Sequence, residues 1–298
     1  MLQLPDTLVC GAGGTLGEAW MRGLLNGAAD GAGIDFRGCR HFLGTSAGAI
    51  VAAVLAAGRA PDAGGDAAGA WNDAAADGAQ LREPRLGAAG RAAGRLGAAA
   101  AAPVAPLALA ATARGGAALR AAALRAVPAR ERRLDRLGHM LDRLGARFDG
   151  RLLIAAVDRR SGRRVLFGAP DAPEAAVRDA VLASCAVPGL FAPVRIGGRE
   201  YVDGGVWSPT NLDAAPAGRG ERVLCLVPTA GGGLLRAPTA ALWTTESLAL
   251  RARGATVETI RPDAASARAM GLNLMDGSRS AAVLAAGYAQ GRRAATGG

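Results

Sequence analysis

Lysine is absent from this 298-residue chain, so all 35 basic side chains are arginines. The formal net charge of +10 would suit a nucleic acid or an anionic membrane surface. The arginines are spread along the chain, however, and aromatic residues make up only 4% of it. No basic run is interleaved with aromatic side chains, as a platform for single-stranded nucleic acid requires. We therefore expect no nucleic-acid partner, and a core packed from alanine, valine and leucine.

Cysteine and histidine are also scarce, with four and two residues respectively. Cys10, Cys39, Cys185 and Cys225 stand in apolar surroundings, and no two of them have C-x-x-C spacing. Metal ligation needs clustered cysteine and histidine side chains. The sequence therefore predicts buried free thiols in a reducing compartment, no metal site and no cofactor.

Signal-peptide and membrane-spanning patterns are missing as well. The N-terminal residues MLQLPDTLVCG have no positive stretch followed by an apolar core. The most membrane-like stretch, residues 96–113, contains Pro103 and Pro106 and is mostly alanine, which is too weakly apolar to span a bilayer. We expect a cytoplasmic protein. Arginines and leucines within residues 119–133 leave two interpretations open, a peripheral contact with an anionic membrane and a solvated helix face.

What the chain does contain is an alternation of strands and helices separated by glycine turns. Residues 7–10 are expected to form a buried strand, followed by a turn at 11–17 and a helix over about 18–29. A second strand at 40–43 leads through another turn into a helical run at 49–57. Two such units in succession indicate a parallel sheet of the α/β class. We expect further strands at 151–157, 164–167, 194–196, 200–202, 223–227 and 256–260, and helices at 173–183, 239–253 and 278–293.

Residues 59–148 differ in character, because they are rich in alanine, arginine and glycine and contain no strand candidate. Within them Leu134, Leu137, Leu141 and Leu144 recur at helical spacing. We expect a single domain over residues 1–298, in which residues 59–148 form a helical, partly loose insertion that covers the active site as a lid.

Ser46 is the candidate nucleophile. It stands in Gly44-Thr45-Ser46-Ala47-Gly48, a G-x-S-x-G pentapeptide between an expected strand and an expected helix. On a sharp strand-to-helix turn, a serine hydroxyl is lifted off the end of the sheet. Gly44 and Gly48 fit this turn, because a side chain at either position would collide across it.

A serine hydroxyl needs a base to take its proton. His41 lies within the strand before Ser46, and His139 lies on the leucine-containing helix of the insertion, so neither supports a Ser-His-Asp triad. Asp203 is the better candidate. It ends an expected strand, and the two glycines after it let the chain turn tightly enough for the carboxylate to approach another loop. An aspartate that merely closes a turn is the alternative interpretation.

The first glycine turn offers hydrogen-bond donors for an anion. Gly13 and Gly14 stand at the mouth of a helix, where consecutive backbone amides can point at negative charge. Gly11, Gly14 and Gly17 also fit a dinucleotide-binding variant of this turn, with Asp35 at about the right distance for a ribose. A dinucleotide-binding reductase is therefore a further alternative, although short-chain reductases use a Tyr/Lys pair and this chain has no lysine.

In this order, the three motifs resemble those of patatin-like phospholipases. The motifs are the turn at 11–17, the pentapeptide at 44–48 and Asp203-Gly204-Gly205. Residues 183–193 (ASCAVPGLFAP) are also similar to the approach of that family to its catalytic aspartate. The resemblance spans about residues 7–58 and 150–228.

The resemblance implies a three-layer α/β/α fold and a Ser-Asp dyad that hydrolyses lipid acyl esters without a catalytic histidine. On this chain it makes Ser46 the nucleophile and Asp203 the base. The amides of Gly13, Gly14 and Thr15 would form the oxyanion hole.

One position departs from the pattern of the family. Arg or Lys commonly precedes the last glycine of the first turn, and Leu16 stands there in this chain. The backbone donors do not depend on that side chain, but any contact of a basic residue with substrate phosphate or with the turn is lost. A catalytically weak lipid-binding or interaction protein of the same fold therefore remains an alternative to the acyl hydrolase.

Overall fold

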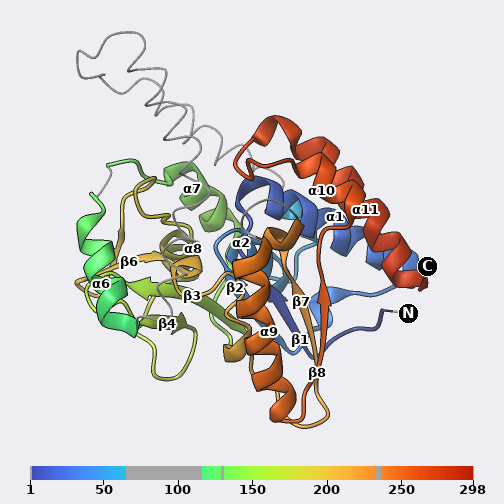
Figure 1. Cartoon of the computed structure of the whole chain (residues 1–298), viewed down its shortest axis with the longest axis horizontal. Coiled ribbons are helices and arrows are strands. Elements are labelled where there is room, and N and C mark those ends of the chain that lie inside the picture. Colours follow the sequence, from blue (N-terminus) through green and yellow to red (C-terminus); the bar gives the residue numbers. More distant parts are fainter. Residues whose placement is uncertain (1, 65–115, 129–130, 232–235, 298) are drawn as a thin grey trace.

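A single eight-stranded sheet organises the computed structural model, which describes residues 2–64, 116–128, 131–231 and 236–297 (Figure 1). The strands are β1 (Thr7–Cys10), β2 (His41–Thr45), β3 (Leu152–Asp158), β4 (Arg164–Phe167), β5 (Val194–Ile196), β6 (Arg199–Asp203), β7 (Arg222–Leu226) and β8 (Thr256–Ile260). Their order is β5-β6-β3-β2-β1-β7-β8, with β4 also paired to β3. The neighbouring strands β3, β2, β1, β7 and β8 are parallel to one another. The pairs β3–β4, β3–β6 and β5–β6 are antiparallel.

Helices cover both faces of this sheet, so the expected three-layer α/β/α fold is confirmed (Figure 1). The described helices are α1 (Gly14–Ala32), α2 (Ala47–Ala56), α6 (Gly116–Ala126), α7 (Asp135–Leu144), α8 (Val177–Ser184), α9 (Arg236–Ala252), α10 (Ala264–Met270) and α11 (Ser280–Thr296). In the described part of the chain, none of them is long and apolar enough to cross a membrane.

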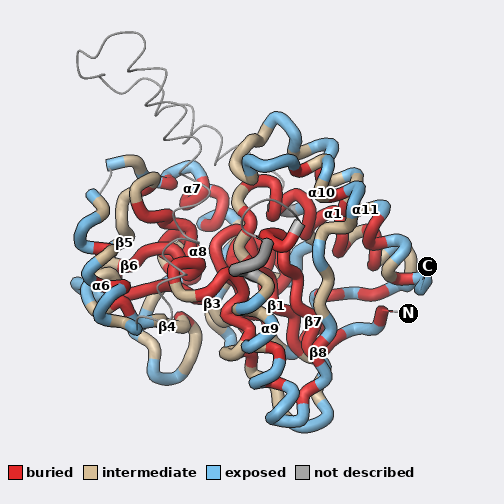
Figure 2. The backbone as a smooth tube through the Cα atoms, in the orientation of Figure 1, coloured by how far each residue is buried: buried red, intermediate tan, exposed pale blue. Residues whose placement is uncertain are grey.

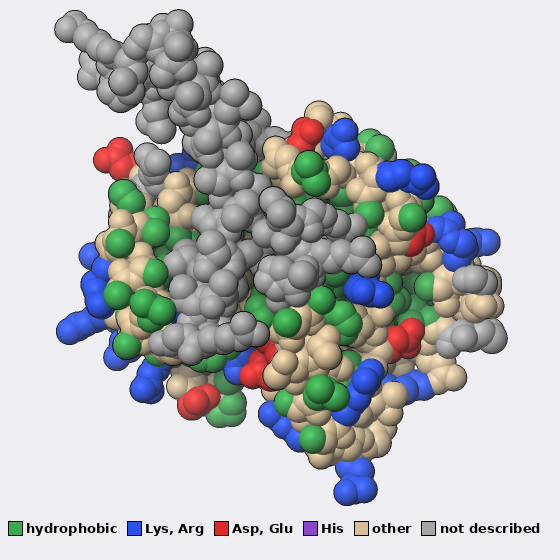
Figure 3. Space-filling view, in the orientation of Figure 1, with side chains coloured by type: hydrophobic (Ala, Val, Ile, Leu, Met, Phe, Trp, Pro, Cys, Tyr) green, Lys and Arg blue, Asp and Glu red, His purple; other side chains and the backbone are tan. Residues whose placement is uncertain are grey.

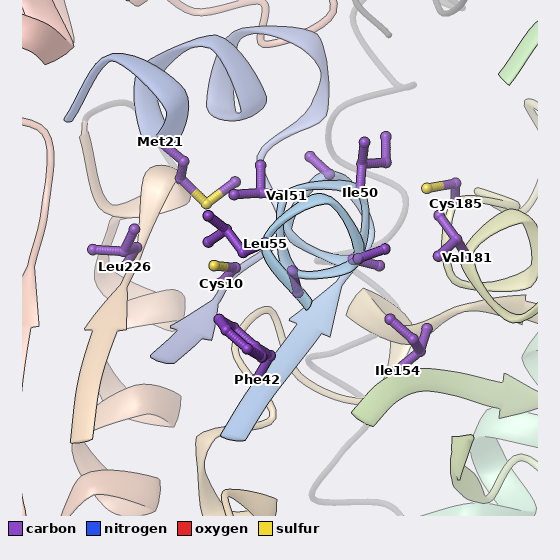
Figure 4. Close-up of a cluster of buried hydrophobic side chains, with 14 of the residues drawn as sticks. Cys10, Met21, Phe42, Ile50, Val51, Leu55, Ile154, Val181, Cys185 and Leu226 are labelled. Carbon is purple, nitrogen blue, oxygen red and sulfur yellow. The ribbon is translucent and has the colours of Figure 1, made fainter. Parts of the chain in front are cut away.

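Successive side chains of a strand point to opposite faces of the sheet, so neighbouring strand residues belong to different hydrophobic cores. Leu8 and Cys10 of β1 belong to the larger core, whereas Val9 belongs to the core that includes residues of α9. Helix α2 is buried along its whole length in the larger core (Figure 2). Its Val51 lies beside Met21 of α1, and its Ile50 points toward α8 (Figure 4). The nucleophile candidate therefore precedes a helix that packing holds on all sides.

Helix α11 packs closely along α1, and glycines make the approach possible. A Cβ atom on Gly27 would lie 2.0 Å from the carbonyl oxygen of Tyr288, and one on Gly291 would lie 2.1 Å from that of Leu24. The indole Nε1 of Trp20 donates a hydrogen bond of 2.9 Å to the buried Gln290 Oε1. The C-terminal helix is thus an integral layer over α1.

Several predicted boundaries were wrong. Helix α1 begins at Gly14, four residues before the predicted start, because part of the glycine turn forms its first turn. Helix α8 begins at Val177 instead of Pro173, after an extended residue at Ala176. The sequence did not predict α10.

In the described ends of the 59–148 insertion, the longest elements are the helices α6 and α7. Residues 65–115 lie outside the described residues. The division into a core domain and a lid-like insertion therefore stays a prediction.

Candidate active site

Ser46 occupies the turn between β2 and α2 with a backbone conformation that few side-chain-bearing residues adopt. Its φ is 53° and its ψ is −123°, and only 4% of the residue is exposed. A Cβ on Gly44 would lie 2.4 Å from Ala49 Cα, and one on Gly48 would lie 1.9 Å from the carbonyl oxygen of Cys10. Both glycines are therefore required by close backbone contacts, and the turn has the strained geometry of a nucleophile elbow.

The pairing of β3 explains how Ser46 and Asp203 come together. Residues 154 and 155 pair with both β2 and β4, and residues 156 and 157 pair with both β4 and β6. Strands β2 and β6 therefore lie end to end along one edge of β3, with β4 along the other. The end of β2 at Thr45 is opposite Ala155, and the end of β6 at Asp203 is opposite Ala156. The sheet thus brings the two site residues to one junction.

The last residue of α8 and the loop after it connect both sides of this junction. Ser184 Oγ accepts a hydrogen bond from the Ser46 amide (2.8 Å) and donates one to the carbonyl oxygen of Ala155 (2.7 Å). Two residues further on, the carbonyl oxygen of Ala186 accepts from the Asp203 amide (3.0 Å). Residues 183–193, which carried part of the family resemblance, therefore hold the nucleophile turn and the aspartate in one frame.

Asn211 is a second residue that connects the two turns, and the sequence did not predict its role. It is fully buried with a positive φ of 50°. Its Nδ2 group donates to Thr45 Oγ1 (3.1 Å), to the Gly204 carbonyl (3.4 Å) and to the Ser208 carbonyl (2.8 Å). Because Thr45 precedes Ser46 and Gly204 follows Asp203, one side-chain amide ties the two turns together. An asparagine after a turn motif is too ordinary a signal to predict this contact.

The Asp203 carboxyl is buried and only partly hydrogen-bonded. Its Oδ1 accepts from the Gly205 amide (2.7 Å), whereas Oδ2 accepts no hydrogen bond of standard geometry from any residue the structure describes. Burial raises the pKa of Asp203 to about 7, and the neighbouring Ser46 hydroxyl and the Gly205 amide oppose this rise. Such a carboxyl can exchange a proton near neutral pH, and contacts that are loose at rest commonly tighten when substrate binds.

The first glycine turn presents unpaired amides. The Gly11 amide donates to Leu226 O (3.0 Å) and the Leu16 amide donates to Leu274 O (2.9 Å). Between them, the amides of Gly13, Gly14 and Thr15 donate to no acceptor among the described residues. The first N–H groups of a helix lack acceptors within the helix, and the helix dipole favours an anion there. This turn can therefore offer three donors to a developing negative charge.

Leu16 and Gly17 belong to the packing beneath this turn. The Leu16 side chain is fully buried in the larger hydrophobic core. A Cβ on Gly17 would lie 2.9 Å from the Pro228 side chain, and one on Gly13 would lie 2.6 Å from it. In place of a basic side chain, Leu16 therefore supports the turn by apolar packing.

Other candidate residues lie away from the junction. His41 begins β2, at the opposite end of the strand from Ser46, and His139 is exposed on α7. Asp35 is exposed after the end of α1, and its carboxylate forms an ion pair with Arg37 (2.8 Å). Because a ribose-binding acid would have to stand near the first turn of α1, the proposed role of Asp35 in a dinucleotide site is wrong.

The cysteines are free and buried, as predicted: Cys10, Cys39, Cys185 and Cys225. Burial raises the pKa of each of these thiols, which keeps them protonated. No group of three His, Cys, Asp or Glu side chains that could hold a metal ion occurs among the described residues.

Comparisons with known proteins bear on the family of this chain. The crystal structure of VipD from Legionella pneumophila is similar over 99% of this chain and 67% of its own, at 14% sequence identity and a TM-score of 0.42. No curated protein sequence gives a significant match. The family model described as patatin-like phospholipase matches residues 8–216, which is more than half of the chain. With its motifs in the same order and this match across most of the sheet, the chain belongs to the patatin-like phospholipase family.

Proposed function

We propose that this protein is a serine acyl hydrolase that cleaves acyl esters of lipids with a Ser46–Asp203 dyad. Family membership suggests lipid acyl hydrolysis in general. The observation that carries the specific proposal is the junction on β3, where a strained serine faces a buried carboxyl whose pKa is about 7.

In the proposed reaction, ionised Asp203 takes the proton of the Ser46 hydroxyl as Oγ attacks the ester carbonyl carbon. The carbonyl oxygen becomes an oxyanion, which the amides of Gly13, Gly14 and Thr15 stabilise. The tetrahedral intermediate then breaks its bond to the alcohol, and Asp203 returns the proton to that leaving group. Water, deprotonated by Asp203, then attacks the carbonyl carbon of the acyl-serine. The bond from that carbon to Ser46 Oγ breaks, Asp203 returns the proton to Oγ, and the carboxylic acid is released.

The hydrogen bond of the Ser46 amide supports the assignment of the glycine turn as the oxyanion hole. That amide donates to Ser184 Oγ, so it could bind the oxyanion only if this hydrogen bond were broken. The three unpaired amides at the start of α1 are free for this role. Removing one such donor from a hydrolase typically costs about 100- to 1000-fold in kcat.

We further propose a cytoplasmic enzyme that acts on lipid or acyl-ester substrates and needs neither metal nor cofactor. On the face of the molecule in Figure 3, arginine side chains are scattered around the periphery among acidic ones. We propose that nucleic acid is not a partner, because no basic run of the sequence is interleaved with aromatic side chains. Peripheral contact with an anionic membrane remains a proposal, testable by flotation with liposomes of anionic or zwitterionic lipid.

Hydrolysis of p-nitrophenyl butyrate and laurate by purified wild type, Ser46→Ala and Asp203→Asn tests the proposed dyad. We expect Ser46→Ala to lose at least about 1000-fold in kcat, and Asp203→Asn at least about 100-fold. Ser161→Ala is the matched control, because Ser161 lies in the turn between β3 and β4 and contacts Asp158 instead of the junction. Full activity of Ser46→Ala would refute the proposal.

A further inference from the structure

A segment near the C-terminus lies directly against the oxyanion turn. Residues 271–276 connect α10 to the short 3-10 helix η8 (Gly277–Arg279). The carbonyl oxygen of Leu274 accepts the Leu16 amide at 2.9 Å. A Cβ on Gly14 would lie 2.7 Å from Met275 Sδ and 2.9 Å from the Leu274 carbonyl oxygen. The segment therefore closes one side of the turn that offers the unpaired amides, and it lies outside the residues that the family model matches.

The segment is held in a defined conformation by its own hydrogen bonds. Asn273 Oδ1 accepts from the Met275 amide (3.1 Å), and Asp276 Oδ1 accepts from the Ser278 hydroxyl (2.6 Å). Arg279 reaches back to donate to the carbonyl oxygen of Ala269 (3.0 Å). Since α11 follows directly and packs along α1, the segment has a fixed position relative to the glycine turn.

The side chains that this segment packs against the protein core are apolar. Leu274 and Met275 are half-buried and pack against the larger hydrophobic core, whereas their neighbour Leu272 is 83% exposed. When the amides of Gly13, Gly14 and Thr15 bind the carbonyl oxygen of an ester substrate, the acyl chain and the alcohol of that ester extend away from the carbonyl along the glycine turn. A thioether side chain suits methylene groups, because it is unbranched, polarizable and adapts to irregular apolar shapes.

We propose that Met275 is a specificity-determining residue that contacts the first carbons of the acyl chain beside the oxyanion hole. The proposal rests on the acyl-hydrolase function proposed above. A bulkier side chain at this position would narrow the path of the chain where it leaves the carbonyl, and a smaller one would widen it. Chain-length preference should then respond to the size of residue 275.

The test compares kcat/KM for p-nitrophenyl acetate, butyrate, octanoate and laurate, all below their micelle concentrations, in wild type, Met275→Ala, Met275→Leu and Met275→Trp. We expect Met275→Trp to lower the octanoate-to-acetate ratio by at least about tenfold, as expected for loss of complementarity to one or two methylenes. Met275→Ala should change the ratio by at least about threefold, and Met275→Leu should leave it near that of wild type. Leu272→Ala is the matched control and should leave the ratio unchanged, because its side chain is exposed on the same segment.

Labelling of Ser46 by a small fluorophosphonate separates this proposal from the proposed function. If wild type is labelled and hydrolyses esters but Met275→Ala and Met275→Trp both keep the wild-type ratio, the role of Met275 is wrong while the hydrolase stands. If wild type is neither labelled nor active on any ester, the proposed function is wrong, and the inference about Met275, which depends on it, is wrong as well. Thermal unfolding of each variant identifies a substitution that prevents folding, in which case the remaining size variant decides.

Discussion

At the scale of single residues, Asp203 gives the most direct prediction. Its carboxyl must be ionised to accept the Ser46 proton, and burial raises its pKa to about 7. Activity should therefore rise with pH through about 7 and level off above about 8, because the protonated acid cannot act as a base. The measurement is kcat/KM against pH between 5 and 9 for an uncharged ester, which reports the pKa values of the free enzyme. A profile that is already flat at pH 5 would contradict this assignment.

The sequence could indicate Ser46 and Asp203, since each stands in a short motif whose glycines permit a tight turn. The structure adds the reason for those glycines, because a side chain at Gly48 would collide with the Cys10 carbonyl. Ser184 and Asn211 could not be assigned in the same way. Their hydrogen bonds reach residues that are 138 and 166 positions away, and no local spacing encodes such contacts.

At the scale of elements, the glycine contacts between α1 and α11 predict a large effect from one methyl group. Gly27→Ala places a Cβ about 2.0 Å from the Tyr288 carbonyl, so the helices must separate. We expect a loss of about 1–3 kcal/mol in the free energy of unfolding from overpacking. Without the clash, alanine would stabilise an α-helix relative to glycine by about 1 kcal/mol. Urea unfolding of the variant against wild type measures the difference.

Gly38→Ala is the matched control for this prediction, because the Cβ at that site would meet only a Leu4 side chain at 3.5 Å. Its stability should stay within about 0.5 kcal/mol of wild type, as is usual for a surface substitution. If Gly27→Ala were as stable as Gly38→Ala, the close packing of α11 on α1 would be wrong.

Elements with a clear local pattern were predictable from the sequence. Strands β1, β4, β5 and β8 were expected at the bounds that the structure has, because each is a short apolar or alternating run between turn residues. Helix starts were less predictable. The first turn of α1 contains Gly14 and Gly17, which also belong to the anion-binding turn. Helix propensity is therefore low there, and tertiary contacts decide the conformation.

At the scale of the whole molecule, the residues matched by the family model do not form a complete structural unit. The match ends at residue 216, before β7, which pairs with β1 in the middle of the sheet. It also excludes α11, which covers α1. The layered α/β class could be predicted from the strand–turn–helix order, but the role of the C-terminal third could not, because no motif marks it.

A fragment of residues 1–216 should therefore fail to fold. Without β7 and α11, β1 would become an edge strand and the buried side of α1 would be exposed, which favours aggregation. Gel filtration and circular dichroism of the fragment beside the full chain test this expectation. A monomeric fragment with cooperative thermal unfolding would show that the C-terminal third is dispensable.

The central claim is that Asp203 activates Ser46, and covalent labelling tests it most directly. Wild type, Ser46→Ala and Asp203→Asn are incubated with a fluorophosphonate at pH 8, and the modified peptide is identified by mass spectrometry. The account predicts one adduct on Ser46 in wild type, none in Ser46→Ala, and labelling at least about 100 times slower in Asp203→Asn. Labelling of Asp203→Asn at the wild-type rate, or an adduct on another residue, would contradict the account.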